Sequence, residues 1–183
     1  MIGPILAVLA GCVAALVGYA ATRPADFRYQ RRARFTAAPR DIVPQLDDFR
    51  AWAAWSPWEK LDPAMQRTYG GPARGVGATY AWDGNKRAGA GRLEITRSDE
   101  HGVRMNLDFT RPMRASNVVD FAFTPQNGGT EVVWTMNGSN NLMGKLFCVF
   151  VNMDKMIGRD LEAGLASLKA VSERSSSSAG AAS

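Results

Sequence analysis

Residues 117–136 read NVVDFAFTPQNGGTEVVWTM, and this stretch indicates the class of fold. Apolar and polar residues alternate on both sides of Asn127-Gly128-Gly129, where asparagine and glycine readily take the positive φ of a tight turn. Alternation with a period of two is typical of strands that bury one face. The stretch therefore predicts two antiparallel strands, Asn117 to Thr124 and Glu131 to Met136, joined as a hairpin.

Similar alternation appears upstream in short segments separated by turn residues. They cover Gln66 to Gly70, Ala78 to Asp83, Gly91 to Arg97, and Val103 to Phe109. A further strand lies near the start of the chain, where Phe27, Tyr29, Ala33 and Phe35 share one parity. Strands connected by turns this short form antiparallel hairpins, so we expect one seven-stranded antiparallel sheet.

Two helical patterns complete the folded part of the chain. Pro39 and the apolar positions between Ile42 and Trp55 predict two short helices, broken near Pro44. From about Leu142 to Ser172 apolar residues recur every three or four positions, which predicts one long amphipathic helix. The order strand, two helices, six strands, long helix predicts an α+β fold whose curved sheet wraps around the C-terminal helix.

The N-terminal segment has the length and composition of a transmembrane helix. Ile2 to Ala21 holds no charged residue and is long enough to cross about 30 Å of hydrocarbon. We expect residues 1–23 to form a single-pass membrane anchor. A cleaved signal peptide is the alternative, since Gly18-Tyr19-Ala20 resembles a cleavage site, although no Lys or Arg precedes the apolar run.

The arginines that follow this segment bear on its orientation. Five of them lie between residues 23 and 34 and none lies before the segment, so the positive-inside rule places the domain on the cytoplasmic side. Most of them also fall in a predicted strand, which leaves the periplasmic or extracytoplasmic side open. Ala7, Gly11 and Ala15 recur at four-residue spacing, which would allow a weak homodimer through close helix packing.

The rest of the composition indicates where the domain ends and which partners it has. We expect residues 24–173 to fold as one domain and residues 174–183 to form a disordered tail, because Ser175 to Ser183 holds only Ser, Ala and Gly. The net charge of +5 comes from scattered basic residues, many with acidic neighbours, so we expect no nucleic-acid partner.

The residues expected on the inner side of the sheet and helix form the candidate ligand-binding site. They line an apolar cavity if the sheet stands away from the helix and form an ordinary core if they fill the space, and the periodicity allows both. Arg31 also has inward parity, and its guanidinium either binds an anionic ligand group or reaches water at the strand end. The apolar set is Tyr69, Tyr80, Trp82, Met105, Leu107, Phe109, Phe121, Phe123, Trp134, Met136, Phe150, Met153 and Ile157.

The sequence predicts no metal, no cofactor and no catalytic residues. His101 is the only histidine and falls in a predicted turn, far from Cys12 and Cys148 in the chain. The glycine-rich residues 70–77 lack the Gly-Lys-Ser/Thr ending of a phosphate loop. No acidic residue of the predicted strands has inward parity, as a general acid inside a cavity would need.

Several stretches carry a resemblance to a known family, among them WSPWEKLDP at residues 55–63, YAWDGN at 80–85 and NMDKMIG at 152–158. Over residues 27–171 the chain resembles the START-like SRPBCC family, also called polyketide cyclase/dehydrase and lipid transport. The resemblance implies a helix-grip fold with a deep hydrophobic cavity. It implies no particular activity, because the family includes lipid carriers and cyclases and supplies no catalytic motif to carry over.

Three functions follow from these observations. We expect non-catalytic binding of a hydrophobic small molecule or lipid in an internal cavity near the membrane. The first alternative is a polyketide cyclase or dehydratase in which Tyr69, Tyr80 or Arg31 transfers a proton or polarises the substrate. The second is a protein-interaction or stress accessory domain with a filled cavity.

Overall fold

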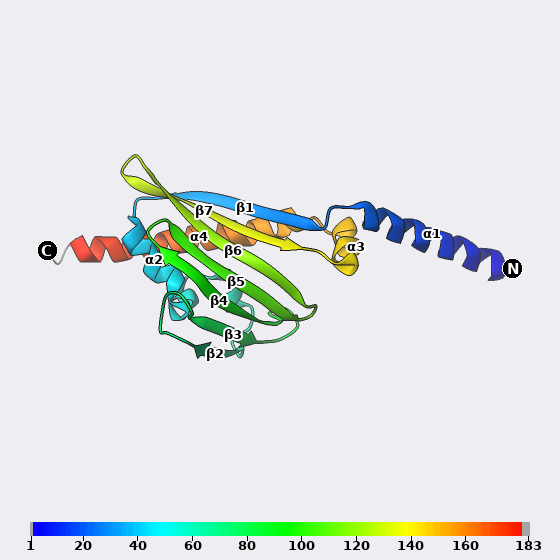
Figure 1. Ribbon diagram of the computed structural model, residues 1–183, viewed down its shortest axis with the longest axis horizontal. Coiled ribbons are helices and arrows are strands. Elements are labelled where there is room, and N and C mark those ends of the chain that lie inside the picture. The colour runs from blue at the N-terminus through cyan, green and yellow to red at the C-terminus, as the bar shows by residue number, and fades with distance from the viewer. Residues whose placement is uncertain (1, 181–183) are drawn as a thin grey trace.

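The computed structural model describes residues 2–180 and places one antiparallel sheet against a long C-terminal helix and a shorter helical connection, with a separate N-terminal helix (Figure 1). The elements are α1 (Ile2–Thr22), β1 (Asp26–Phe35), α2 (Pro39–Asp47), the 3-10 helices η1 (Phe49–Ala54) and η2 (Pro57–Lys60), β2 (Gln66–Gly70), β3 (Thr79–Asp83), β4 (Ala90–Asp99), β5 (Gly102–Arg111), β6 (Ala115–Gln126), β7 (Gly129–Ser139), α3 (Leu142–Phe150) and α4 (Met153–Gly180).

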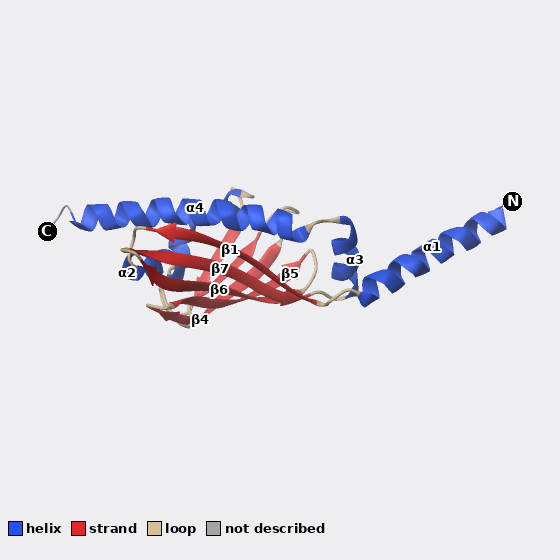
Figure 2. Cartoon of the chain, turned by 90° about the horizontal axis from the view of Figure 1, so that it is seen from above, coloured by secondary structure: helices blue, strands red, loops and turns tan. Residues whose placement is uncertain are grey.

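The sheet has seven strands in the order β1-β7-β6-β5-β4-β3-β2, and every neighbouring pair is antiparallel. The predicted hairpin is present, with Phe121 of β6 opposite Trp134 of β7. At its turn, Asn127 and Gly128 have φ values of 45° and 78°. Helix α4 lies along one face of the curved sheet, which we call the inner face (Figure 2). The predicted α+β helix-grip architecture is confirmed.

The helical connection between β1 and β2 differs from the prediction in where it breaks. Helix α2 continues through Pro44 to Asp47, and the chain leaves the helix at Asp48, whose side chain accepts a hydrogen bond from the backbone N–H of Arg50 and so caps η1. Pro44 is tolerated because the φ of proline is compatible with a helix. Its missing N–H removes only one backbone hydrogen bond, the one to a carbonyl of the exposed first turn.

The predicted long C-terminal helix is two helices. Between α3 and α4, Val151 is extended, with φ −120° and ψ 125°. The side chain of Asn152 then accepts a hydrogen bond from the backbone N–H of Lys155, which starts α4 as a new helix. Helix α4 continues to Gly180, beyond residue 173, where we expected the ordered domain to end. Residues 181–183 of the expected tail lie outside the described residues.

Helix α4 packs closely on the inner face. Leu161, Leu165 and Leu168 point toward the sheet and are at most 1% exposed. A Cβ atom at Gly164 would lie 2.6 Å from the Trp134 ring, so this glycine permits the close approach of helix and sheet. The contact extends the hydrophobic core from β7 to the middle of α4.

Helix α1 projects away from the domain (Figures 1 and 2). Its residues Gly3–Thr22 have a mean hydropathy of 2.2 and are long enough to cross a membrane. Its last turn returns to the domain, where Ala20 is fully buried and α1 contacts α3.

Candidate functional site

The structure brings most of the predicted binding residues together on the inner face. Tyr80, Met105, Leu107, Phe121, Phe123, Trp134 and Met136 are all buried in one hydrophobic cluster. Met105 and Phe121 are 0% exposed and Trp134 is 1% exposed. A void large enough for water beside these side chains would give them accessible surface. The interior between Phe121, Trp134 and the middle of α4 is therefore packed core.

The other end of the inner face is only partly covered. Trp82 and Phe109 pack edge to face with ring centroids 5.7 Å apart, and Phe27 and Tyr29 stack at 4.8 Å. All are half-buried against the core, as are two residues from the helical side. We call this set the inner-face rim: Phe27, Tyr29, Trp58, Trp82, Phe109 and Ile157.

The strand register places the strand residues of this rim at the end of the sheet nearest α1. Phe27 is the second residue of β1, which starts four residues after α1 ends, and it pairs with Gly138 near the end of β7. Phe109, near the end of β5, pairs with Gly91, which in turn pairs with Trp82. The half-buried aromatic side chains of the strands are therefore concentrated where the domain meets the N-terminal helix.

Three predicted site residues lie at the margin or outside this region. Phe150 is 71% exposed on α3, because the break after it turns α3 away from the course of α4, and Met153 is half-buried in the first turn of α4. Tyr69 lies on the edge strand β2, where the guanidinium of Arg50 stands 4.7 Å from its ring centroid.

Arg31 is engaged in holding α4 against the edge of the sheet. Its Nε donates to Glu162 Oε1 at 2.7 Å, and its two terminal nitrogens donate to the carboxylate of Asp154 at 3.2 Å. These hydrogen bonds, first that to Asp154 and then that to Glu162, raise the pKa of Arg31. Gly158 leaves the room that the guanidinium occupies. Because Arg31 already binds two carboxylates, it is better placed to join β1 to α4 through ion pairs than to bind an anionic ligand.

A buried carboxylate that the sequence reasoning missed lies beneath the aromatic residues of β2 and β3. Glu59 belongs to η2, and its side chain is 8% exposed. Its Oε1 accepts a hydrogen bond from the hydroxyl of Tyr80 at 2.5 Å, and its Oε2 accepts one from Nε of Arg67 at 2.7 Å. The search for inward acids covered only the strands, whereas Glu59 comes from the connection before β2. Its place in WSPWEKLDP, two residues after Pro57, was the available signal.

The electrostatics of this group follow from its burial. Desolvation is the main cause that raises the pKa of Tyr80, and the hydrogen bond to Glu59 adds to it. The hydrogen bond to Glu59 likewise raises the pKa of Arg67. The arrangement therefore keeps Tyr80 protonated and Arg67 charged, so the tyrosine hydroxyl acts as a donor whose proton is already directed at a carboxylate.

Aromatic rings extend from this group across the inner face. The Tyr80 ring stacks on Phe49 at 5.7 Å, on Tyr69 at 5.4 Å and on Trp82 at 6.0 Å between centroids. A row of aromatic rings presents flat apolar surface, which is suited to binding an apolar or aromatic ligand. Among the described residues there is no group of three or more His, Cys, Asp or Glu side chains that could hold a metal ion.

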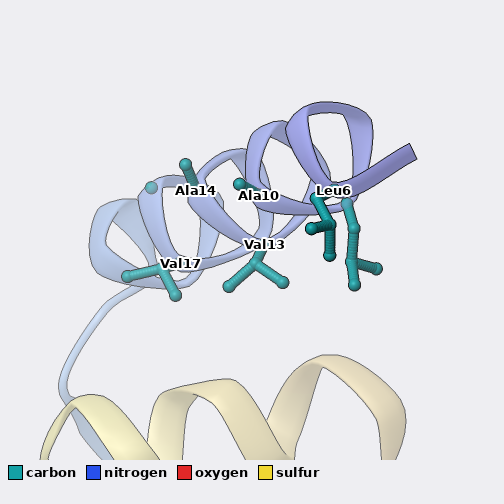
Figure 3. Close-up of a pocket in the computed structure, with 7 residues that line it drawn as sticks. Leu6, Ala10, Val13, Ala14 and Val17 are labelled. Atoms are coloured by element: carbon teal, nitrogen blue, oxygen red, sulfur yellow. The ribbon is translucent and has the colours of Figure 1, made fainter. Parts of the chain in front are cut away.

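Two surface hollows lie elsewhere. One runs along α1, where Leu6, Val13 and Val17 point to one side of the helix (Figure 3). The other lies at the α1 end of the sheet and is lined mainly by polar residues of β5, β6 and β7, including Asn106, Asp108 and Ser139. Neither contains a residue of the predicted site.

Comparison with known proteins agrees with this geometry. Residues 26–173 match the family model described as polyketide cyclase/dehydrase and lipid transport. The chain belongs to this family. The match covers the sheet and α4 and leaves out α1.

Solved structures of similar fold extend the comparison. The di-domain ARO/CYC StfQ from the steffimycin biosynthetic pathway superposes with a TM-score of 0.66 at 10% identity, covering 84% of this chain and 52% of that one. Protein MLL2253 from Mesorhizobium loti gives 0.58 at 12% identity, covering 81% and 98%. Protein CV1439 from Chromobacterium violaceum gives 0.57 at 13% identity, covering 80% and 96%. At these identities the likeness concerns the fold. Comparison with curated protein sequences found no match.

Proposed function

We propose that this protein is a membrane-tethered module that binds a hydrophobic small molecule or lipid at the inner-face rim without catalysing a reaction. The observation that carries the proposal is the contrast within the inner face. The centre of the interior is closed by side chains that are at most 1% exposed, among them Met105, Phe121 and Trp134, whereas the rim at the α1 end keeps aromatic surface partly open. The family includes lipid transport in its description, which agrees with such a role.

The proposed tether is α1. An uncharged helix of this length inserts favourably into hydrocarbon, and β1 follows it after a short connection, so the rim would sit close to the bilayer. Arg23 and the arginines of β1 favour a cytoplasmic domain. The small residues Ala7, Gly11 and Ala15 would support a weak homodimer in the membrane.

Affinity would come from apolar surface removed from water. At about 25 cal/mol per Å², covering on the order of 200 Å² of rim and ligand surface contributes about 5 kcal/mol. Part of this is offset by the cost of immobilising the ligand. The proposed complex is therefore of modest affinity, which suits a molecule that must also be released.

A fluorescent fatty-acid probe tests this proposal on the full chain in mild detergent. We expect the probe to bind the unaltered protein and Ile157→Glu to weaken binding about tenfold, equivalent to about 1.4 kcal/mol, because the carboxylate would need to be desolvated beside the ligand. Ala166→Glu, on the exposed side of α4, is the matched control and should bind as the unaltered protein does. Equal binding by the Ile157 variant, or no binding by any form, would reject the proposal, and the second result would favour a protein-interaction domain with a filled interior.

A second candidate is a cyclase or dehydratase, and the specific observation in its favour is the buried Glu59–Tyr80 pair. StfQ, a structural neighbour, carries ARO/CYC in its name. In this chain the Tyr80 oxygen would accept a proton from the substrate while the proton of its own hydroxyl passes to Glu59 Oε1, and Arg67 would hold the Glu59 carboxylate in place. Incubation with a poly-β-ketone thioester analogue tests the idea by mass spectrometry. Cyclised or dehydrated product that is lost in Tyr80→Phe would support it, and product that persists in that variant would remove Tyr80 from the reaction.

A further inference from the structure

Helix α3 exposes more large apolar surface than any other element of the domain beyond α1. Its sequence is LMGKLFCVF, and none of its residues is buried. Leu142, Met143, Phe147 and Phe150 are 48%, 61%, 50% and 71% exposed. Contiguous apolar patches of this kind mark an interaction surface, because a solvated surface of this composition is unfavourable.

The exposed residues lie on one side of the helix. Met143, Phe147 and Phe150 are spaced i, i+4, i+7, so they form one stripe, and Leu142 flanks it. The other side of α3 faces the domain. There Cys148 Sγ accepts a hydrogen bond from Asn140 at 3.8 Å. The apolar stripe is thus directed away from the folded domain.

Helix α3 is also held against the end of α1. The Nζ of Lys145 donates to the backbone carbonyl of Ala21 at 3.4 Å, and Ala20 beside it is fully buried. Figures 1 and 2 show α3 between α1 and the sheet. Because Arg23 follows directly on the apolar helix, this end of α1 would meet the lipid headgroups if α1 spans a bilayer. At any depth of this end of α1 in the membrane, α3 lies beside it.

We propose that α3 is an interfacial helix that lies in the membrane surface and inserts Leu142, Met143, Phe147 and Phe150 into the leaflet that α1 leaves. This inference rests on the proposed tether. A lipid surface fits better than a protein partner for two reasons. The stripe lies on a helix that contacts the end of α1, and Lys145 and Arg23 both lie at that end, where they can meet anionic headgroups. A nine-residue helix alone is also too small to bury the roughly 800 Å² per partner of a stable protein interface.

The proposed position has a consequence for ligand transfer. Helix α3 contacts α1, and β1, which carries Phe27 and Tyr29 of the inner-face rim, starts four residues after α1 ends. With the stripe in the leaflet, the rim would face the headgroup region within about the width of one helix, on the order of 10 Å. An apolar molecule could then pass between bilayer and rim without crossing bulk water.

Site-specific fluorescence in vesicles of phosphatidylcholine and phosphatidylglycerol tests the position of α3. The full chain would carry Cys12→Ala and Cys148→Ala, and single cysteines would be introduced by Met143→Cys and by Phe147→Cys and labelled with an environment-sensitive dye. Val13→Cys reports on the middle of α1, and Ala166→Cys, exposed on α4, is the control that should remain in water. Circular dichroism verifies that each variant keeps its helix content.

We expect blue-shifted emission from the dyes at positions 143 and 147 and stronger quenching by nitroxides high on the lipid acyl chain than by nitroxides near its methyl end. The dye at position 13 should show the reverse depth preference. If the dyes at 143 and 147 behave as the dye at 166 does, the inference about α3 is wrong, even when position 13 is quenched. If position 13 is not quenched, the proposed tether fails, and quenching at 143 and 147 would still support α3 as a membrane-contacting helix.

Discussion

Asn117 is a polar residue among the apolar side chains of the inner face. It lies between Leu107 of β5 and Gly138 of β7, and its Oδ1 is buried without a hydrogen-bond partner among the described residues. We predict that Asn117→Leu raises the free energy of unfolding by about 1 kcal/mol, because a buried unpaired carbonyl is replaced by an apolar group of similar shape. Denaturant unfolding in detergent measures this, with Asn106→Leu on the exposed face as the control. A loss of stability instead would mean that Oδ1 has a bound partner, such as water or ligand.

Tyr80 makes stability depend on alkaline pH. Burial, and then the hydrogen bond to Glu59, raises its pKa above the ordinary value of 10.0, so the folded state holds this proton more tightly than the unfolded state does. The stabilisation is therefore fully present below pH 10.0 and is lost as the pH rises through the higher folded-state value. We predict that, above pH 10.0, the free energy of unfolding measured with urea falls less steeply with pH in Tyr80→Phe than in the unaltered protein. Parallel curves for the two forms would show that Tyr80 is not the group responsible.

At the scale of elements, the approach of α4 to the sheet depends on Gly164. Alanine there would gain about 1 kcal/mol of helix propensity, yet its Cβ would stand 2.6 Å from the Trp134 ring, and overpacking costs about 1–3 kcal/mol. Trp134 is fully enclosed, so the ring cannot move aside, and we predict that Gly164→Ala lowers the thermal unfolding midpoint. Ala166→Gly, on the exposed side of the same helix, measures the propensity effect alone. A stabilised Gly164 variant would contradict the close packing described above.

The elements were predictable to different degrees. The strands could be predicted because alternation assigns each residue to one face, and Phe121 opposite Trp134 follows directly from the hairpin. The break between α3 and α4 could not be predicted from periodicity, because apolar residues continue through Val151 in the same rhythm. The local signal was Asn152, whose side chain caps α4. Glu59 was missed because the search for inward acids covered only residues in strands.

For the whole molecule, the sequence could predict which residues face inward but not whether they enclose space. Periodicity fixes the face on which a side chain lies, whereas the separation of sheet and helix depends on contacts such as that between Gly164 and Trp134. The structure places packed core under one part of α4 and partly open apolar surface at the end that carries α1 and α3. Tether, interfacial helix and binding rim would then share one end of the molecule.

Methyl NMR of the full chain in micelles, with addition of a long-chain fatty acid, tests this account most directly. Ile157 reports on the rim, and Leu165 and Leu168 report on the closed half of the interior. The account predicts saturable shifts of the Ile157 methyl signals, with Leu165 and Leu168 unchanged. Shifts at the leucines with none at Ile157, or no shifts at all, would contradict a binding site at the rim.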